Sequence, residues 1–155
     1  MNIKQISVAL ENTSGKLYEL TQVLSGVDVD IRSIWVTEES EYSVVHLIVD
    51  KPDLAFATIR DKGYLAKTVD VFALKADDKP GGLMRVLERL KAINLNIEYV
   101  YGFGEKTENK AVFIFRITDT ERAIKALQDG LLDYVSKDRV EGRDTSSPWE
   151  FVESL

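Results

Sequence analysis

Residues 11–17 read Glu11-Asn12-Thr13-Ser14-Gly15-Lys16-Leu17, and they open a pattern that occurs twice in the chain. The first copy continues through Leu24 to Val29-Asp30-Ile31. Each part recurs 66 residues later, as Gly81-Gly82-Leu83, Leu90 and Leu95-Asn96-Ile97. A repeat at constant spacing indicates that the chain contains one structural unit twice.

Each copy is predicted to contain strand, helix, strand, strand, helix and strand. Apolar and β-branched runs favour strands, whereas apolar residues three or four apart favour helices. The expected strands are 6–10, 31–37, 42–49, 66–76, 97–101, 111–117 and 132–140, and the expected helices are 17–27, 52–62, 83–93 and 120–129. This βαββαβ order predicts an α+β fold with antiparallel sheets and both helices on one face. The expected domains are residues 1–70 and 71–141, followed by a tail, 142–155.

The composition excludes several classes of protein. The chain has 155 residues, with 20 Lys and Arg against 26 Asp and Glu, so its net charge of -6 argues against nucleic-acid binding. No apolar run approaches the roughly 18 residues of a membrane span. The N-terminus lacks the apolar segment of a signal peptide, and the chain has no cysteine. We therefore expect a cytoplasmic protein without membrane contact.

The third strand of each copy is apolar on both sides. In the first copy Val45 and Leu47 alternate with Val44 and Ile48, and the strand at 111–117 shows the same pattern. A sheet with helices on one side normally has polar residues on the other. We expect the open face to be covered by the other half or by a second chain, and we predict a homodimer.

The loop between first strand and first helix has features suited to a small ligand. Glycine lets a ligand approach the backbone closely, and the amides of a helix start favour a carboxylate. Asn12 offers both a donor and an acceptor, which suits a zwitterion. Turn and capping chemistry alone explains the same residue types, and no phosphate-binding motif is present.

These loops, with the helix and the second strand that follow each, resemble the opening of an ACT domain. The resemblance covers two tandem copies and implies ferredoxin-like folds that sense small molecules, often amino acids, at interfaces between domains. In serine-sensing members, a loop Asn and a second-strand Asn of a partner domain hold the ligand, and Asn12 and Asn96 match these. The other copies carry Asp78 and Asp30 instead, so the first-loop site is favoured and the two sites are not equivalent.

The candidate ligand-binding residues follow from this resemblance and lie in four segments. They are Asn12, Thr13, Ser14, Gly15, Lys16 and Leu17; Asp78, Lys79, Pro80, Gly81, Gly82 and Leu83; Asp30 and Ile31; and Asn96 and Ile97.

The expected function is that of a non-catalytic regulatory protein that binds an amino acid, with no catalytic residue, cofactor or metal. His46 is the single histidine, and it is interpreted as a packed, hydrogen-bonded strand residue, although some ACT sites use a histidine. One alternative is a ligand-independent regulatory subunit that docks on a biosynthetic enzyme. Another is an enzyme on the ferredoxin-like scaffold, which the fold alone does not exclude.

Overall fold

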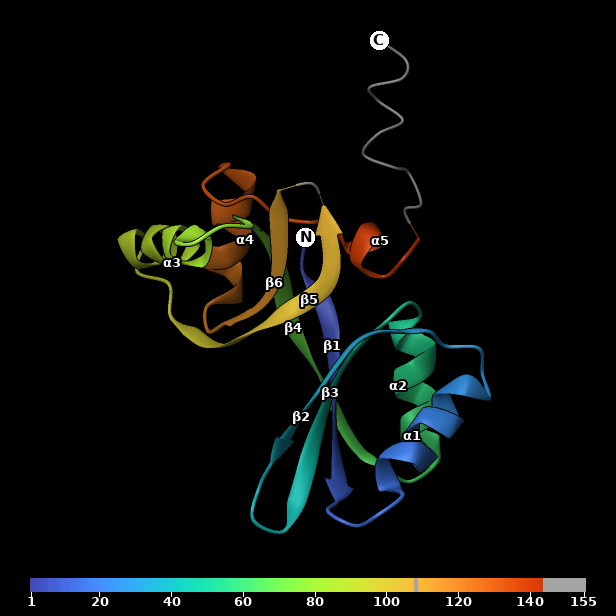
Figure 1. Cartoon of the computed structure of the whole chain (residues 1–155). Helices are drawn as coiled ribbons and strands as arrows, with labels where there is room; N and C mark the ends of the chain where they lie inside the picture. Colours follow the sequence, from blue (N-terminus) through green and yellow to red (C-terminus); the bar gives the residue numbers. More distant parts are fainter. Residues whose placement is uncertain (108, 144–155) are drawn as a thin grey trace. The chain divides into compact units, whose positions relative to one another are not determined.

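The computed structural model describes residues 1–107 and 109–143 (Figure 1). The chain forms two compact units. The N-terminal unit comprises Lys4–Asp70, and the C-terminal unit comprises Met1–Ile3 and the chain from Val71 onward. Strand β4 crosses the boundary and contributes to both units.

The N-terminal unit is a sheet of strand order β2-β3-β1-β4 with two helices. Its elements are β1 (Ile3–Glu11), α1 (Lys16–Ser25), β2 (Ile31–Glu38), β3 (Tyr42–Val49), α2 (Pro52–Asp61) and β4 (Leu65–Asp77). Strand β3 pairs antiparallel with both β1 and β2. Helices α1 and α2 cover one face of the sheet, which Figure 1 shows.

The core of the N-terminal unit lies between this face and the two helices. Leu20 and Leu24 of α1 and Ala55 and Ile59 of α2 are buried in it. They pack against alternate residues of the strands, namely Ile6, Val8, Leu10, Val45, Leu47 and Val49. Full burial of a leucine or isoleucine side chain stabilises the fold by about 1.5–3 kcal/mol, so this interface holds the unit together.

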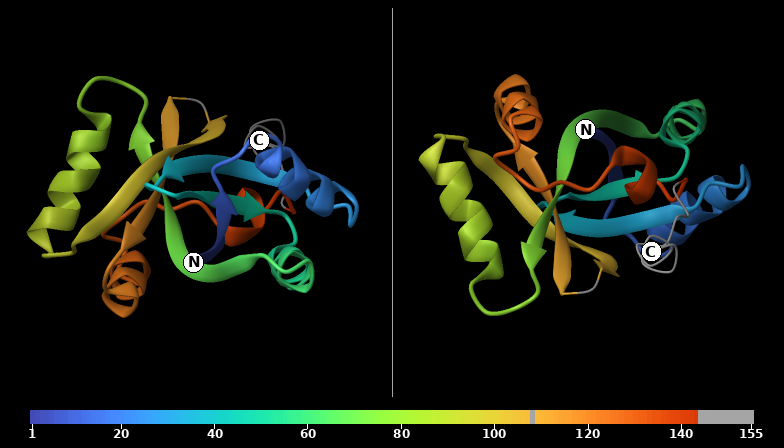
Figure 2. Two further views of the ribbon diagram at one scale, coloured as in Figure 1. Left: turned by 90° about the horizontal axis from the view of Figure 1, so that it is seen from below. Right: turned by 90° about the horizontal axis from the view of Figure 1, so that it is seen from above.

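The C-terminal unit repeats this arrangement. It contains the second part of β4, α3 (Gly82–Ala92), β5 (Ile97–Thr107), β6 (Lys110–Ile117), α4 (Thr120–Gln128) and α5 (Lys137–Val140). The strand order is β4-β6-β5, and both pairings are antiparallel. Figure 2 shows α3 and α4 in two further views.

Helices α3 and α4 of the C-terminal unit pack into one core. Leu90 of α3 and Leu127 of α4 contact the same cluster, which includes Phe72 and Phe115 of the strands. The predicted fold class is therefore confirmed, with α+β units, antiparallel sheets and helices on one face.

The predicted strand at 132–140 is wrong. Tyr134 forms an isolated antiparallel bridge with Leu74, supported by two backbone hydrogen bonds of 2.8 Å, and the chain then turns into the short helix α5. Ser136 starts this helix because its hydroxyl accepts a hydrogen bond from the Arg139 amide at 3.2 Å. A left-handed Gly142, with φ of 77°, ends it. These local signals outweigh the apolar pattern that favoured a strand.

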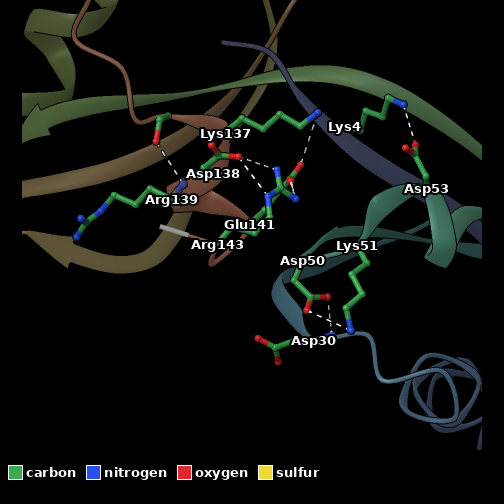
Figure 3. Close-up of polar contacts among 11 residues, drawn as sticks. Lys4, Asp30, Asp50, Lys51, Asp53, Lys137, Asp138, Arg139, Glu141 and Arg143 are labelled. Carbon is green, nitrogen blue, oxygen red and sulfur yellow. Dashed lines mark hydrogen bonds and ion pairs between the residues drawn. The ribbon is translucent and has the colours of Figure 1, made fainter. Parts of the chain in front are cut away.

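A compact charge cluster lies on helix α5 and the residues directly after it (Figure 3). Glu141 is 1% exposed and is ion-paired with Arg143 and, at 4.0 Å, with Lys137. Arg143 also contacts Asp138 at 2.9 Å. Burial raises the pKa of Glu141 above its ordinary value, and the two neighbouring cations partly oppose that shift. Of the predicted tail, residues 144–155 lie outside the described part of the chain.

The face of β6 opposite the helices is also buried. Val112 and Ile114 are 3% and 0% exposed, and Val135 and Val140 of the same unit are buried as well. No helix in the described residues is long and apolar enough to cross a membrane.

Candidate functional site

The β1–α1 loop forms a tight turn that ends in a left-handed glycine. The Thr13 amide donates to the Glu11 carbonyl at 2.8 Å, and the Lys16 amide donates to the Thr13 carbonyl at 3.4 Å. Gly15 then takes a φ of 88°, which a residue with a Cβ adopts only at a cost. Helix α1 begins at the next residue.

The β4–α3 loop has the same pattern of backbone hydrogen bonds and a left-handed glycine at the same position. The Lys79 amide donates to the Asp77 carbonyl at 2.9 Å, and the Gly82 amide donates to the Lys79 carbonyl at 3.0 Å. Gly81 has a φ of 84°. Each hydrogen bond lies 66 residues after its counterpart, so the repeat of sequence is a repeat of loop conformation.

Both helices that follow these loops lack a capping side chain. Gly15 and Gly81 occupy the N-cap positions of α1 and α3, and no side chain accepts a hydrogen bond there. In contrast, the Asp119 carboxylate caps α4 by accepting a hydrogen bond from the Arg122 amide at 3.1 Å. First-turn amides without a capping partner attract a carboxylate, which the helix dipole also favours.

The second loop is tighter than the first at one position. A Cβ on Gly82 would lie 1.8 Å from the Asp77 carbonyl oxygen, a distance that excludes any side chain unless the loop moves. The counterpart of Gly82 is Lys16, which carries a long side chain. The first loop must therefore be wider between strand and helix than the second.

An open depression of about 540 Å³ surrounds the second loop. It is lined by Asp77, Asp78, Lys79, Pro80, Gly81, Gly82, Leu83, Met84, Ala111 and Phe113. All six predicted residues of this loop line the depression, together with strand residues and Met84 of α3, which the sequence did not single out. The cross-strand pairing of Asp77 with Lys110 in the register of β4 and β6 is the signal that would have placed β6 here.

Charged side chains surround this depression. Lys110 Nζ lies 2.5 Å from Asp77 Oδ1, and this hydrogen bond and charge hold the pKa of Asp77 below its ordinary value. Lys79 and Arg85 act in the same direction. A guanidinium nitrogen of Arg85 lies 3.8 Å from where a Cβ on Gly81 would be, so a positive charge stands close to the start of α3.

In the first loop, Asn12 has a hydrogen-bond partner on a distant strand. Its Nδ2 donates to Glu38 Oε1 at 3.2 Å. Glu38 lies at the end of β2, opposite Ser43, and β3 in turn pairs with β1 beside this loop. The strand register therefore explains the contact.

Lys16 lies 3.5 Å from Glu19, an exposed pair that contributes little to stability.

The predicted residues at the second strand of each unit lie just before or at the strand start. The Asp30 amide donates to Asp50 Oδ1 at 2.8 Å (Figure 3), and the Asp30 carboxylate lies 3.7 Å from Arg32. Asn96 Nδ2 donates to Thr118 Oγ1 at 3.0 Å. Ile31 and Ile97 begin β2 and β5.

Asn96 and Ile97 line a different depression from the second loop. It has a volume of about 370 Å³ and includes Leu87, Leu90, Lys91, Asn94 and Leu95. Helix α3 has 11 residues and lies between the second loop, at its start, and Asn96, beyond its end, a length of roughly 16 Å. One unit alone therefore does not bring its own loop and its own second-strand start together.

His46 is packed and hydrogen-bonded, as predicted. Its ring stacks on Trp35 with centroids 4.4 Å apart, and both ring nitrogens lie near polar side chains. No group of three or more potential metal ligands occurs in residues 1–107 and 109–143.

Comparison with known proteins places the chain in a family. The sequence model of the ACT domain pair matches residues 1–142, so the chain belongs to the ACT domain pair family. ACT domains are regulatory domains, and the fold and repeated loops agree with this class.

The solved structures that are similar to the chain include the following two. Protein BT0572 from Bacteroides thetaiotaomicron is 29% identical, with 91% of this chain and 96% of that chain covered and a TM-score of 0.83. The ligand-free regulatory subunit of aspartate kinase from Thermus thermophilus is 15% identical, with coverages of 81% and 91% and a TM-score of 0.58, a likeness of fold. No curated protein matches the chain.

Proposed function

We propose that this protein is a non-catalytic regulator that binds a small ligand, an amino acid, at an interface between ACT domains. Its domains would be residues 1–70 and 71–141, with 142–155 as a tail. The observation that carries the proposal is the repeated loop before α1 and α3, where a left-handed glycine replaces a capping side chain. An amino acid's carboxylate is the kind of group that such helix starts attract.

The two loops differ in the chemistry that they offer the rest of the ligand. Asn12 presents a neutral amide that can donate and accept, whereas its counterpart Asp78 is a carboxylate. We propose that the first loop, completed by Asn96 of another domain, is the principal amino-acid site. A site of the second loop with Asp30 would repel a carboxylate and attract an ammonium group.

We propose that the protein forms a homodimer. Strand β2 is an edge strand of the N-terminal sheet, and Ile34 and Val36 on it are 42% and 46% exposed. Exposed apolar residues on an edge strand favour pairing with another chain. Sedimentation at micromolar concentration would contradict this proposal if it gave a stable monomer.

Regulation would follow from the position of the ligand between domains. A ligand that binds an assembled interface more tightly than separated domains shifts the population toward the assembly, by its differential affinity alone. A biosynthetic enzyme is the partner class that we propose for the regulated complex, since the ligand is an amino acid. The cytoplasmic location stays a prediction from the sequence.

A thermal-shift screen of the full chain against the twenty amino acids tests the proposed function. A ligand at 100 times its Kd stabilises the folded state by about 2.7 kcal/mol, which raises the melting temperature visibly. We expect a selective rise with one or a few amino acids. A flat response would contradict the proposal and favour a ligand-independent docking subunit.

Two matched variants then test the site. Asn12→Ala should lose most of the ligand-induced rise. Glu38→Ala removes only the partner of Asn12 in the free protein, so it should retain the rise. If Asn12→Ala binds as well as the unmodified chain, the assignment of the first loop is wrong.

A further inference from the structure

A cluster of polar side chains lies on the face of the N-terminal sheet opposite α1 and α2. Three neighbouring strands contribute Gln5 and Ser7 from β1, Trp35 and Thr37 from β2, and His46 from β3. Side chains alternate between the faces of a strand. His46 lies between Val45 and Leu47, which belong to the helix-side core, so the cluster occupies the other face.

Both ring nitrogens of His46 lie within hydrogen-bond distance of polar side chains. Nδ1 lies 3.2 Å from Gln5 Nε2 and 3.0 Å from Ser7 Oγ. An amide nitrogen donates, so Nδ1 is the accepting nitrogen of the ring. Nε2 lies 3.3 Å from Thr37 Oγ1, and the Thr37 hydroxyl donates to the Val44 carbonyl at 3.4 Å. This arrangement selects the neutral ring with its proton on Nε2.

A second proton on the ring would disturb the hydrogen bonds of this cluster. It would bind at Nδ1 and face the amide donor of Gln5, whose side chain is 0% exposed. Ser7 Oγ accepts from the same amide at 3.3 Å and lies 3.0 Å from Nδ1, so the proton would replace the hydrogen bond from Gln5 by one to Ser7. The Trp35 ring stacks on the half-buried imidazole at an interplanar angle of 20° and covers one face of it.

The charge that acts on the ring from strand β4, which lies beyond β1 in the sheet, is positive. Lys67 lowers the pKa of His46, and the larger cause of the same shift is burial of the ring. Gln5 and Ser7 of β1 and Thr37 of β2 carry no charge. The surroundings on β1, β2 and β4 therefore all favour the neutral ring over the charged one.

We propose that this cluster is an acid-sensitive switch: a proton on His46 breaks the hydrogen bond with Gln5 and loosens the face formed by β1, β3 and β2. The inference is independent of the proposed ligand. A base that binds its proton less readily in the folded state stabilises that state fully above its ordinary pKa of 6.5. The stabilisation falls as the pH decreases through that value, because the unfolded chain then binds more protons.

Nuclear magnetic resonance of the histidine ring tests the switch without ambiguity, since the chain has one histidine. On the full chain at pH 7.5 we expect the tautomer with the proton on Nε2. We expect the ring to titrate with a midpoint below 6.5, and the melting temperature to fall between pH 7.5 and pH 5. A proton on Nδ1, or a midpoint at or above 6.5, would overturn the proposal.

Substitution of Gln5 by a carboxylate should make the surroundings of His46 favour the charged ring. Gln5→Glu places a carboxylate at the accepting nitrogen and should move the midpoint upward by about one pH unit, a tenfold change in proton affinity. Gln22→Glu, the same change at an exposed position of α1, should leave the midpoint unchanged. An unmoved midpoint in folded Gln5→Glu would contradict the switch.

A second variant keeps the test valid if Gln5→Glu fails to fold. His46→Gln preserves a polar side chain but cannot titrate. Its melting temperature should fall less between pH 7.5 and pH 5 than that of the unmodified chain. The same fall in both proteins would overturn the proposal.

Discussion

Gly15 and Gly81 share one backbone conformation, with φ of 88° and 84°, although 66 residues separate them. Each stands immediately before the first helix of its unit and leaves that helix start without a capping side chain. Around this shared geometry the side chains have diverged, with Asn12 in one loop and Asp78 in the other. The backbone feature is common to both loops, and ligand preference would reside in the side chains.

Alanine at Gly81 should destabilise the C-terminal unit. A side chain in the left-handed region costs about 1–2 kcal/mol, so Gly81→Ala should lower the free energy of unfolding by that amount. Gly102→Ala is the control, because Gly102 has an ordinary φ and open space where a Cβ would be. Urea unfolding measures both, and equal losses in the two variants would contradict the prediction.

The close approach between Gly82 and Asp77 predicts a difference between the loops. Gly82→Ala forces a methyl group against the Asp77 carbonyl and should cost about 1–3 kcal/mol, as overpacking typically does. Lys16→Ala, at the equivalent position of the first loop, should change stability by less than about 0.5 kcal/mol. If thermal unfolding showed similar losses of stability for Gly82→Ala and Lys16→Ala, the second loop would have moved to accommodate the added methyl group, and the prediction would be wrong.

A stabilising change is predicted at the end of α3. Asn94 has a φ of 55°, and the Leu95 amide returns to the Leu90 carbonyl at 3.0 Å, the hydrogen bond that closes a helix C-terminus. Asn94→Gly should raise the free energy of unfolding by up to about 1 kcal/mol, and Asn94→Ala should lower it. Urea unfolding should give changes of opposite sign in the free energy of unfolding for the two variants. A loss of stability in both would contradict the claim that the left-handed backbone at residue 94 decides the effect.

The buried Glu141 predicts a pH dependence. Because burial raises the pKa of this carboxyl, the folded state binds its proton more readily than the unfolded chain. The stabilisation by this group is fully present below its ordinary pKa of 4.5 and is lost as the pH rises through the raised value. Glu141→Gln should therefore become more stable relative to the unmodified chain between pH 4.5 and pH 7.

Urea midpoints at pH 5, 6 and 7 measure this difference. Arg143 keeps its contact with Asp138 at 2.9 Å in the variant, so its charge retains a partner. Glu88→Gln, at an exposed position of α3, is the control. Its stability difference from the unmodified chain should be the same at all three pH values. A stability difference that does not grow with pH would show that ion pairing outweighs burial.

Most elements were predictable because their signals are local and repeated. Leu20 and Leu24 of α1, at helical spacing, are indeed buried together, and the same spacing recurs in α3. The segment 132–140 was mispredicted because its apolar residues fit a strand, whereas the cap at Ser136 and the left-handed Gly142 determine a short helix. The hydroxyl of Ser136 and the left-handed Gly142 determine the secondary structure of this segment only in the folded chain.

The candidate site was predictable in its residues and less so in its contacts. The glycines and the Asn12 position follow from the repeat. The Asn12–Glu38 hydrogen bond and the ion pair between Asp77 and Lys110 depend on strand register, which brings together residues 26 and 33 positions apart. Pairing between loops and second strands of different domains stays a prediction.

Amide correlation spectra of the full chain, recorded with and without each amino acid, test directly whether the repeated loops bind an amino acid. We predict that one or a few amino acids shift the backbone amides of residues 15–17, with smaller changes at residues 81–83. We also predict a shift of the Asn96 side-chain amide. Spectra that stay unchanged with all twenty amino acids, or shifts confined to other parts of the chain, would contradict the proposed binding site.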